Sequence, residues 1–360
     1  MNILFVYYVP SGGVETLNRQ RSTALKKHNI NCHFLYYNKV RELVNNHNAP
    51  TFITNVDTEI KKIIDDGNYS AIIITSDYKS LARFRNLGYK GKLILEIQGL
   101  GPKHIAKLEL TNAIPYVNNY GDGLLNPRTP HIMQLFDELF LSTPKYNFNN
   151  CFDYSNFTYK FLPVNDHPII AWIGRIEDNK NWREFLGIGH QIITQHNPYA
   201  KLYMFEDPTL SSPQEREAFN QQINLLNLKD NLTIFSNVPN YKMAELFSEI
   251  GDSKGFLCST SKVEGAPYSL LEAMSCRCPV LTTDSDGVKS SIIHNKTGKY
   301  YTLGNISEGV KEAIELITDI RLRNSIRINA LQHLKENFSQ EQYCLNFIKM
   351  LNDLGVEKNS

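Results

Sequence analysis

The chain has 360 residues, a length typical of two domains. Apolar residues make up 42% and charged residues 21%, values that exclude an intrinsically disordered protein. The 38 basic and 37 acidic residues give a formal net charge of +1, which argues against a dedicated nucleic-acid-binding protein.

Short apolar runs alternate with helical patterns along the first half of the chain. The runs predict strands at 3–8, 32–37, 71–75, 93–97 and 138–142, and the spacing of Leu17, Ala24 and Leu25 predicts a helix over 14–28. Such alternation is typical of a parallel sheet with helices on both faces.

The alternation starts again after an irregular segment rich in Asn and aromatic residues, 146–167. Strands are predicted at 168–174, 200–205, 232–235, 255–259 and 279–283, with a helix over 181–195. We therefore expect an α/β protein of two doubly wound, Rossmann-like domains, 1–160 and 161–340, that face a central cleft. A C-terminal helix and tail, 341–360, follows the second sheet, and the pattern leaves open whether it packs back on the first domain.

Several features of the sequence indicate the cellular compartment of the protein. No run of about 18 apolar residues could span a membrane, and residues 2–8 resemble a buried strand more than a signal peptide. The six cysteines lack metal-ligand spacing, which favours reduced thiols in the cytoplasm. Residues 1–165 hold 18 basic and 13 acidic residues. This surplus fits an ordinary solvated face or a peripheral contact with the inner face of a membrane, and both interpretations stay open.

Ligands of open α/β sheets bind at the carboxyl ends of the strands, so the loops after the strands are the candidate sites. After the first strand, Gly12 and Gly13 precede a helix, where backbone amides could approach an anion. At the start of the second domain, Arg175 and Lys180 lie in one loop and could converge on a diphosphate. Taken singly, the glycines are also explained by a tight turn, and the two cations are better explained as solvated side chains.

The loop and helix at 259–276 are the most informative segment. Glu264 lies in the loop, Pro267 suits the first turn of a helix, and Glu272 follows about one turn into it. The two carboxylates could bind opposite ends of a ligand whose phosphates lie over the helix start. The alternative is a surface acid and a glutamate that only stabilises its helix.

These segments together resemble a known family. Glu264 and Glu272, with seven residues between them and Cys278-Pro279-Val280 beyond, resemble the Glu–seven residues–Glu motif of retaining GT-B glycosyltransferases of family 4, glycosyltransferase group 1. The segment 171–175 with Lys180 is similar to the diphosphate-binding loop of that family, and 11–15 to its N-terminal glycine turn. The similarity is best from about 168 to 300.

The resemblance implies a hexosyl or N-acetylhexosaminyl transferase that moves a sugar from a nucleotide-diphosphate donor, with uridine as the expected base. The acceptor would be a glycan, a lipid-linked molecule or a small molecule, so that the product belongs to cell-surface glycan biosynthesis or a related route. Glu272 would bind the ribose hydroxyls and Glu264 the transferred sugar. Arg175 and Lys180 would neutralise the diphosphate, assisted by backbone at Gly12, Gly13, Gly265, Ala266, Tyr268 and Ser269. No metal ion or other cofactor is expected.

The sequence departs from the family pattern at several positions, and Gln98 and Arg277 among them keep alternatives open. Gln98 occupies the place where relatives have a histidine near the reacting sugar, with Glu96 as another substitute, and Gln98 cannot act as a base at neutral pH. Arg277 replaces a usual glycine, and Pro267 lacks a backbone N–H. The alternatives are a catalytically silent relative that binds a glycan or nucleotide as a partner subunit, and a nucleotide-sugar epimerase. We expect acceptor choice to depend on loops at 99–126.

Overall fold

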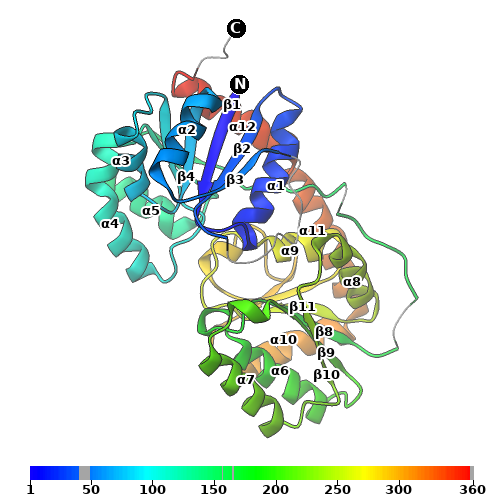
Figure 1. Cartoon of the computed structure of the whole chain (residues 1–360). Helices are drawn as coiled ribbons and strands as arrows, with labels where there is room; N and C mark the ends of the chain where they lie inside the picture. Colours follow the sequence, from blue (N-terminus) through cyan, green and yellow to red (C-terminus); the bar gives the residue numbers. More distant parts are fainter. Residues whose placement is uncertain (40–48, 156, 164–165, 357–360) are drawn as a thin grey trace. The chain divides into compact units, whose positions relative to one another are not determined.

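The structure is a computed structural model that describes residues 1–39, 49–155, 157–163 and 166–356 (Figure 1). Parts of two expected segments therefore lie outside the described residues, namely 156 and 164–165 of the irregular segment and 357–360 of the tail. The chain forms two compact units. Unit 1 contains Met1–Asp153 and Asn337–Ser360, and unit 2 contains Tyr154–Glu336.

Unit 1 is built on a parallel sheet, described here as seven strands in the order β3-β2-β1-β4-β5-β6-β7. The order turns back between β1 and β4, which makes their carboxyl ends the switch point of the sheet. The strands are β1 (Asn2–Tyr7), β2 (Asn31–Tyr36), β3 (Thr51–Ile53), β4 (Tyr69–Thr75), β5 (Lys92–Glu96), β6 (Gly123–Asn126) and β7 (Lys145–Asn147).

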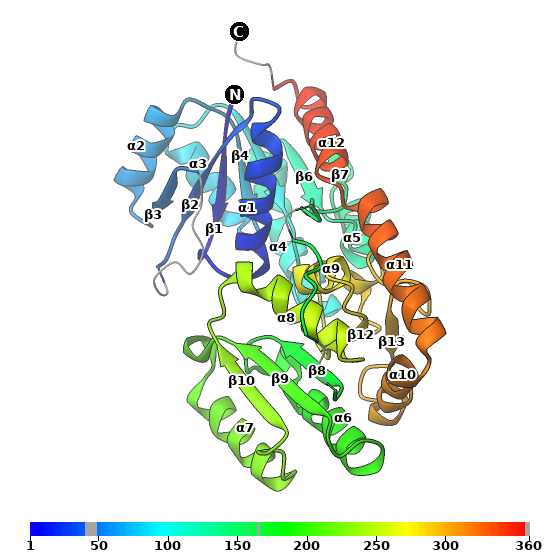
Figure 2. The same cartoon turned by 90° about the vertical axis from the view of Figure 1, so that its right-hand side faces the viewer.

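Alternating side chains of β1 explain why both faces of this sheet are covered. Leu4 and Val6 pack in one cluster with residues of α2 (Asp57–Gly67), α3 (Lys79–Asn86), α4 (Lys103–Tyr120) and α5 (Pro130–Leu139). Ile3 and Phe5 pack on the other face with α1 (Gly12–Lys26) and α12 (Gln340–Asp353). The C-terminal helix thus packs back on unit 1, against α1 (Figure 2).

Unit 2 has a second parallel sheet, described as six strands in the order β10-β9-β8-β11-β12-β13. The strands are β8 (Ile169–Ile173), β9 (Lys201–Glu206), β10 (Leu232–Ser236), β11 (Phe256–Ser259), β12 (Val280–Thr283) and β13 (Lys299–Tyr301). One face packs on α6 (Trp182–Gln195), α7 (Pro213–Leu225) and α10 (Ile306–Thr318). The helices α8 (Asn240–Asp252) and α9 (Tyr268–Ser275) contact the central strands outside that cluster, and α11 (Ile320–Asn337) leads back to unit 1.

The expected pair of doubly wound α/β domains is therefore confirmed, and two local predictions in unit 1 are wrong. Residues 138–142 do not form a strand, because Ile132, Leu135 and Phe136 bury one side of α5 and the helix continues to Leu139. The region 99–126 is mostly the helix α4, which keeps Pro115 in its interior. Burial of its apolar side at every third or fourth residue outweighs the cost of the proline. Among the described helices, α4 included, none is long and apolar enough to cross a membrane.

The six cysteine side chains are buried and form no disulfide. Burial raises the pKa of Cys32 and of Cys278 to about 12, so both thiols are neutral near pH 7. A neutral buried thiol is a poor nucleophile, and we interpret these residues as part of the core.

Candidate active site

The residues predicted to bind a donor in the second domain gather at the carboxyl ends of β8 and β11. These two strands are neighbours in the sheet, with Phe256 beside Ile170 and Leu257 beside Ala171. Arg175 follows β8, Glu264 follows β11, and α9 begins at Tyr268. Because parallel neighbours end at the same edge, the two loops meet there.

Hydrogen bonds join the loop after β8 to the loop after β11. The indole nitrogen of Trp172 donates to the Thr260 hydroxyl over 3.1 Å, and this hydroxyl oxygen lies 2.9 Å from the carbonyl oxygen of Asn181. The backbone amide of Lys262 donates to the carbonyl oxygen of Asn179 over 2.8 Å. The position of Lys180 is therefore set by the segment that precedes Glu264.

Lys180 and Glu264 form an ion pair, with 2.5 Å between Nζ and Oε1. The two side chains are 23% and 13% exposed, so the pair is reachable from solvent and yet partly shielded from it. The backbone of Glu264 rests against Gly287, where a Cβ atom would lie 1.9 Å from the Glu264 carbonyl oxygen. Only glycine fits at that position without moving the loop that carries Glu264.

Arg175 has a carboxylate partner of its own. Its Nη2 lies 2.9 Å from Oε1 of Glu177, and the side chain is half exposed. Each of the two predicted phosphate-binding cations is thus held by a different acid, Arg175 by Glu177 and Lys180 by Glu264. An incoming diphosphate would compete with both carboxylates for these cations.

Glu272 lies in the second turn of α9 and is buried. Its Oε1 accepts a hydrogen bond from the Asn240 side chain over 2.8 Å. Asn240 begins α8, just beyond the carboxyl end of β10, so three strands of the sheet contribute to this group of residues. Gly265 and Ala266 lie in the loop before α9, and Tyr268 and Ser269 form the first residues of that helix. Pro267 at its N-cap position offers no capping side chain, and the Tyr268 side chain is buried.

The remaining predicted residues belong to unit 1. Gly12 begins α1 with a φ of +74°, a conformation that favours glycine, and open space surrounds the Cβ positions of Gly12 and Gly13. Gln98 follows β5, and both ends of its amide are engaged in hydrogen bonds with Glu96 and Asn150. Glu96, the other possible substitute for the histidine, is 1% exposed and bound to Arg21.

Sequence reasoning missed Asn240, Thr260 and Asn150. Asn240 could have been found, because it follows Pro239 at a helix start after a predicted strand. Thr260 and Asn150 carry no local signal, since their partners lie 79 and 52 residues away in the chain.

Residues 156–333 match the family model described as glycosyl transferases group 1. The matched residues lie within unit 2. The Lys180–Glu264 pair and Glu272 all lie within the residues that this model matches.

Similar proteins agree with the fold. A 2-deoxystreptamine N-acetyl-D-glucosaminyltransferase of Niallia circulans is 21% identical over 169 residues, which is 47% of this chain and only 41% of that protein. The structure of sucrose-phosphate synthase from Thermosynechococcus elongatus superposes with a TM-score of 0.83 at 15% identity, covering 98% of this chain and 99% of that one. Anabaena HepE in complex with UDP and glucose gives a TM-score of 0.80 at 16% identity, covering 98% and 100%. The two structural matches show that the chain has the GT-B fold.

Proposed function

We propose that the protein is a retaining, family 4 glycosyltransferase that moves a hexosyl or N-acetylhexosaminyl group from a UDP-sugar to an acceptor. The observation that carries the proposal is the Lys180–Glu264 ion pair at the sheet edge of the glycosyl transferases group 1 domain, with Glu272 in the helix that follows. Two further findings support it: HepE was solved with UDP and with UDP-glucose, and the Niallia circulans relative is named as a glycosyltransferase. The acceptor is a glycan, a lipid-linked molecule or a small molecule.

Breaking the glycosidic bond of the donor builds negative charge on the leaving diphosphate. Lys180 and Arg175 are the cations that stabilise this charge, and they act more strongly on the transition state than on the bound donor. Backbone at Gly12, Gly13, Gly265, Ala266, Tyr268 and Ser269 completes the phosphate contacts in this proposal. With these cations in place the reaction runs without a metal ion, and activity should persist in EDTA.

The ion pair also gives Glu264 two roles. Before the donor binds, its carboxylate neutralises Lys180. When the diphosphate takes over Lys180, the carboxylate oxygens become acceptors for hydroxyl groups of the sugar. Same-face attack by the acceptor would then retain the anomeric configuration.

One observation favours a second candidate, a catalytically silent relative that binds a nucleotide or glycan as a partner subunit. Gln98, at the place of the usual histidine, cannot act as a base and its amide is already bound within unit 1. Donor hydrolysis separates the two candidates, because an active transferase releases sugar slowly without acceptor and a silent relative binds the donor without turnover.

The decisive experiment compares UDP, GDP, ADP and their glucose conjugates in thermal unfolding and donor hydrolysis. We expect UDP and UDP-glucose to raise the unfolding temperature and UDP-glucose to be hydrolysed. A protein that none of these nucleotides stabilises would contradict the proposal. Stabilisation without hydrolysis of a panel of UDP-sugars would favour the silent relative.

Replacing Glu272 with alanine should weaken UDP binding. The ribose hydroxyls lose a charged acceptor, and a hydrogen bond of this kind contributes about 1.5–3 kcal/mol, or roughly 10- to 150-fold in Kd. Titration calorimetry with UDP measures the change. Glu272→Gln keeps a hydrogen-bond acceptor for Asn240 and should lie between the wild type and Glu272→Ala. Glu245→Ala, at an exposed position of α8, is the control. Equal UDP affinity in Glu272→Ala and the control would remove Glu272 from the nucleotide site.

A peripheral contact with the cytoplasmic face of a membrane is also part of the proposal. The first turns of α4 expose Ile105 and Leu108 beside the lysines at 103 and 107, which suits an anionic bilayer surface. Vesicles of phosphatidylglycerol should therefore sediment the protein at low salt, and Ile105→Ser with Leu108→Ser should abolish this. Equal sedimentation of the variant, or none of the wild type, would contradict the contact.

A further inference from the structure

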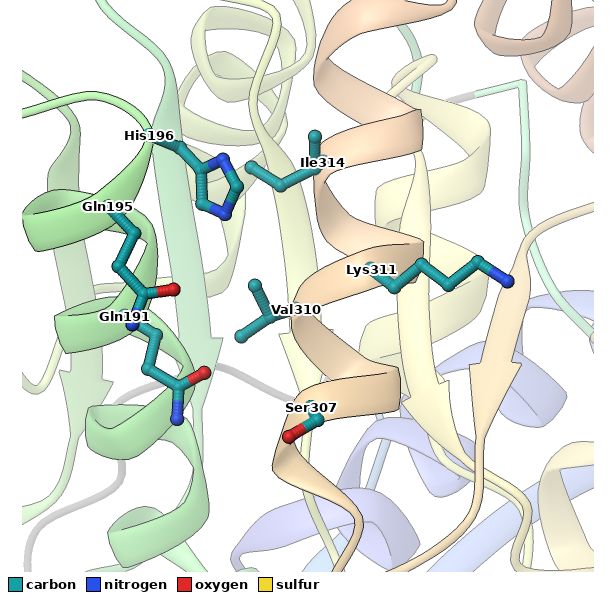
Figure 3. Close-up of a pocket in the computed structure, with 7 residues that line it drawn as sticks. All are labelled: Gln191, Gln195, His196, Ser307, Val310, Lys311 and Ile314. Atoms are coloured by element: carbon teal, nitrogen blue, oxygen red, sulfur yellow. The ribbon is translucent and has the colours of Figure 1, made fainter.

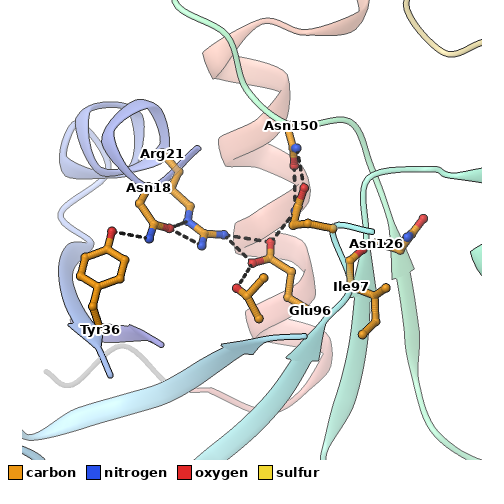
Figure 4. Close-up of polar contacts among 9 residues, drawn as sticks. Asn18, Arg21, Tyr36, Glu96, Ile97, Asn126 and Asn150 are labelled. Atoms are coloured by element: carbon orange, nitrogen blue, oxygen red, sulfur yellow. Dashed lines mark hydrogen bonds and ion pairs between the residues drawn. The ribbon is translucent and has the colours of Figure 1, made fainter. Parts of the chain in front are cut away.

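The side chains of Gln98 and Asn150 form a reciprocal amide pair. Figure 4 shows Asn150 together with the Arg21–Glu96 ion pair on the same unit. Asn150 Nδ2 donates to Gln98 Oε1 over 2.7 Å, and Gln98 Nε2 donates to Asn150 Oδ1 over 3.2 Å. Gln98 Nε2 also donates to Glu96 Oε1 over 3.0 Å. The Gln98 amide oxygen and nitrogen are thus both occupied by unit 1 itself.

A buried ion pair fixes the orientation of this amide. Arg21 Nη1 lies 2.9 and 3.0 Å from the two carboxylate oxygens of Glu96, and both side chains are almost completely buried. The Thr75 hydroxyl donates to Glu96 Oε2 over 2.8 Å, and Asn18 Oδ1 accepts from Arg21 Nε over 2.9 Å. Since Glu96 can only accept, the Gln98 NH₂ group must face it, and the carbonyl oxygen of Gln98 is left to Asn150.

Asn150 lies on the segment by which the chain leaves unit 1. Two residues further on, the Phe152 amide donates to the carbonyl oxygen of Phe338 over 2.8 Å, and the Asp153 amide donates to Oε1 of Gln20 over 2.8 Å. Asn149 also donates through its side chain, to the carbonyl oxygen of Asn337 over 3.0 Å. The outgoing segment 149–153 and the returning segment 337–338 are therefore bonded to each other on unit 1.

We infer that Gln98 is a positioning residue that anchors these two crossing segments to the carboxyl edge of the unit 1 sheet. The order of contacts is Arg21 to Glu96, Glu96 to Gln98, and Gln98 to Asn150. We call the hydrogen bonds that join 149–153 to 337–338 the clamp. A buried ion pair adds little net stability but fixes one geometry, so it is well suited to support this clamp. In this role Gln98 acts through Asn150 and does not contact the sugar.

The effect on catalysis rests on the proposed function. In the proposed function, Gly12 and Gly13 of unit 1 assist the donor-binding residues of unit 2, and the crossing segments are the covalent links between those units. A loosely held crossing lowers the fraction of molecules in which the reacting groups are aligned, so it lowers kcat. The donor-binding residues of unit 2 are untouched, so the KM for the donor should stay the same.

The test compares two single variants, Gln98→Ala and Asn150→Ala, with one double variant. The double variant combines Gln98→Asn and Asn150→Gln, and this double swap keeps a reciprocal amide pair with the same number of atoms. Hydrogen exchange at the Phe152 and Asp153 amides reports the clamp without any substrate. Both single variants should exchange about tenfold faster than the wild type at these amides, and the double swap should recover most of the protection. Gln134→Ala, on an exposed residue of α5 whose amide bonds within its own helix, is the control.

Kinetics give the second readout. Both single variants should lose about tenfold in kcat at an unchanged donor KM, and the double swap should restore kcat. Unchanged exchange in the single variants would overturn the inference. So would a loss of kcat in Gln98→Ala that Asn150→Ala does not share, because Gln98 would then act on substrate directly. A wild type that turns over no nucleotide sugar would contradict the proposed function, and the exchange result would still decide the clamp.

A separate groove lies between α6 and α10 in unit 2. It encloses about 400 Å³ and is lined by Gln191, Gln195, His196, Ser307, Val310, Lys311 and Ile314 (Figure 3). Most of these side chains are open to solvent, with Val310 as the buried floor.

Discussion

Lys180→Ala should lower the turnover of the donor by about 100- to 1000-fold, the usual loss when one fixed donor to a developing negative charge is removed. Lys180 approaches the sheet edge through a loop that Trp172 and Thr260 hold in place, so its ammonium group is positioned before the donor arrives. Its loss also leaves Glu264 without its cation, and an unpaired carboxylate would repel the diphosphate. Steady-state hydrolysis of UDP-glucose measures the effect.

Lys262→Ala is the matched control for Lys180→Ala. Lys262 comes from the same pair of loops and also bonds a carboxylate, with 2.7 Å between Nζ and Asp178 Oδ1, but its side chain is 40% exposed and that of Asp178 is 75% exposed. Its replacement should change turnover by less than about twofold, as is typical of an exposed ion pair. If the two lysine variants were equally active, the diphosphate would have to bind elsewhere on the domain.

The donor half of the candidate site could be predicted from the sequence because its residues lie close to strand ends. The runs that became β8 and β11 are apolar and clearly bounded, and Lys180 and Glu264 follow them within a few residues. The rule that ligands bind at the carboxyl ends of parallel strands then places both in neighbouring loops. Their roles toward a donor stay predictions.

The features that the sequence could not predict depend on residues that are far apart in the chain. The helix α4 contains Pro115 and several asparagines, which locally favour a loop, and only the burial of Ala106, Leu110 and Val117 stabilises the helix. Arg21 and Glu96 are 75 residues apart, and nothing in either neighbourhood indicates that they pair. The engagement of the Gln98 amide follows from that pair and from Asn150, so it could not be read from the motif that singled out Gln98.

Of the substitutions proposed here, those that break the Arg21–Glu96 pair should lower the free energy of unfolding the most. Glu96→Leu leaves the Arg21 guanidinium buried above the Phe5 ring, 3.8 Å from its centre, without a counter-charge. Removing one partner of a buried ion pair costs about 3–5 kcal/mol in the free energy of unfolding, and Arg21→Met should cost a similar amount. Urea unfolding followed by circular dichroism measures both.

The double variant Arg21→Met with Glu96→Leu separates charge from packing. Without either charge, no uncompensated ion remains in the core, so the double variant should be more stable than each single one. Lys61→Met is the control, because Lys61 and Asp65 form an exposed ion pair, and such a pair contributes less than about 1 kcal/mol. A double variant whose loss equals the sum of the two single losses would mean that the side chains stabilise unit 1 independently. The support proposed for Gln98 would then be a set of separate contacts, and hydrogen exchange at Phe152 should respond to Glu96→Leu but not to Arg21→Met.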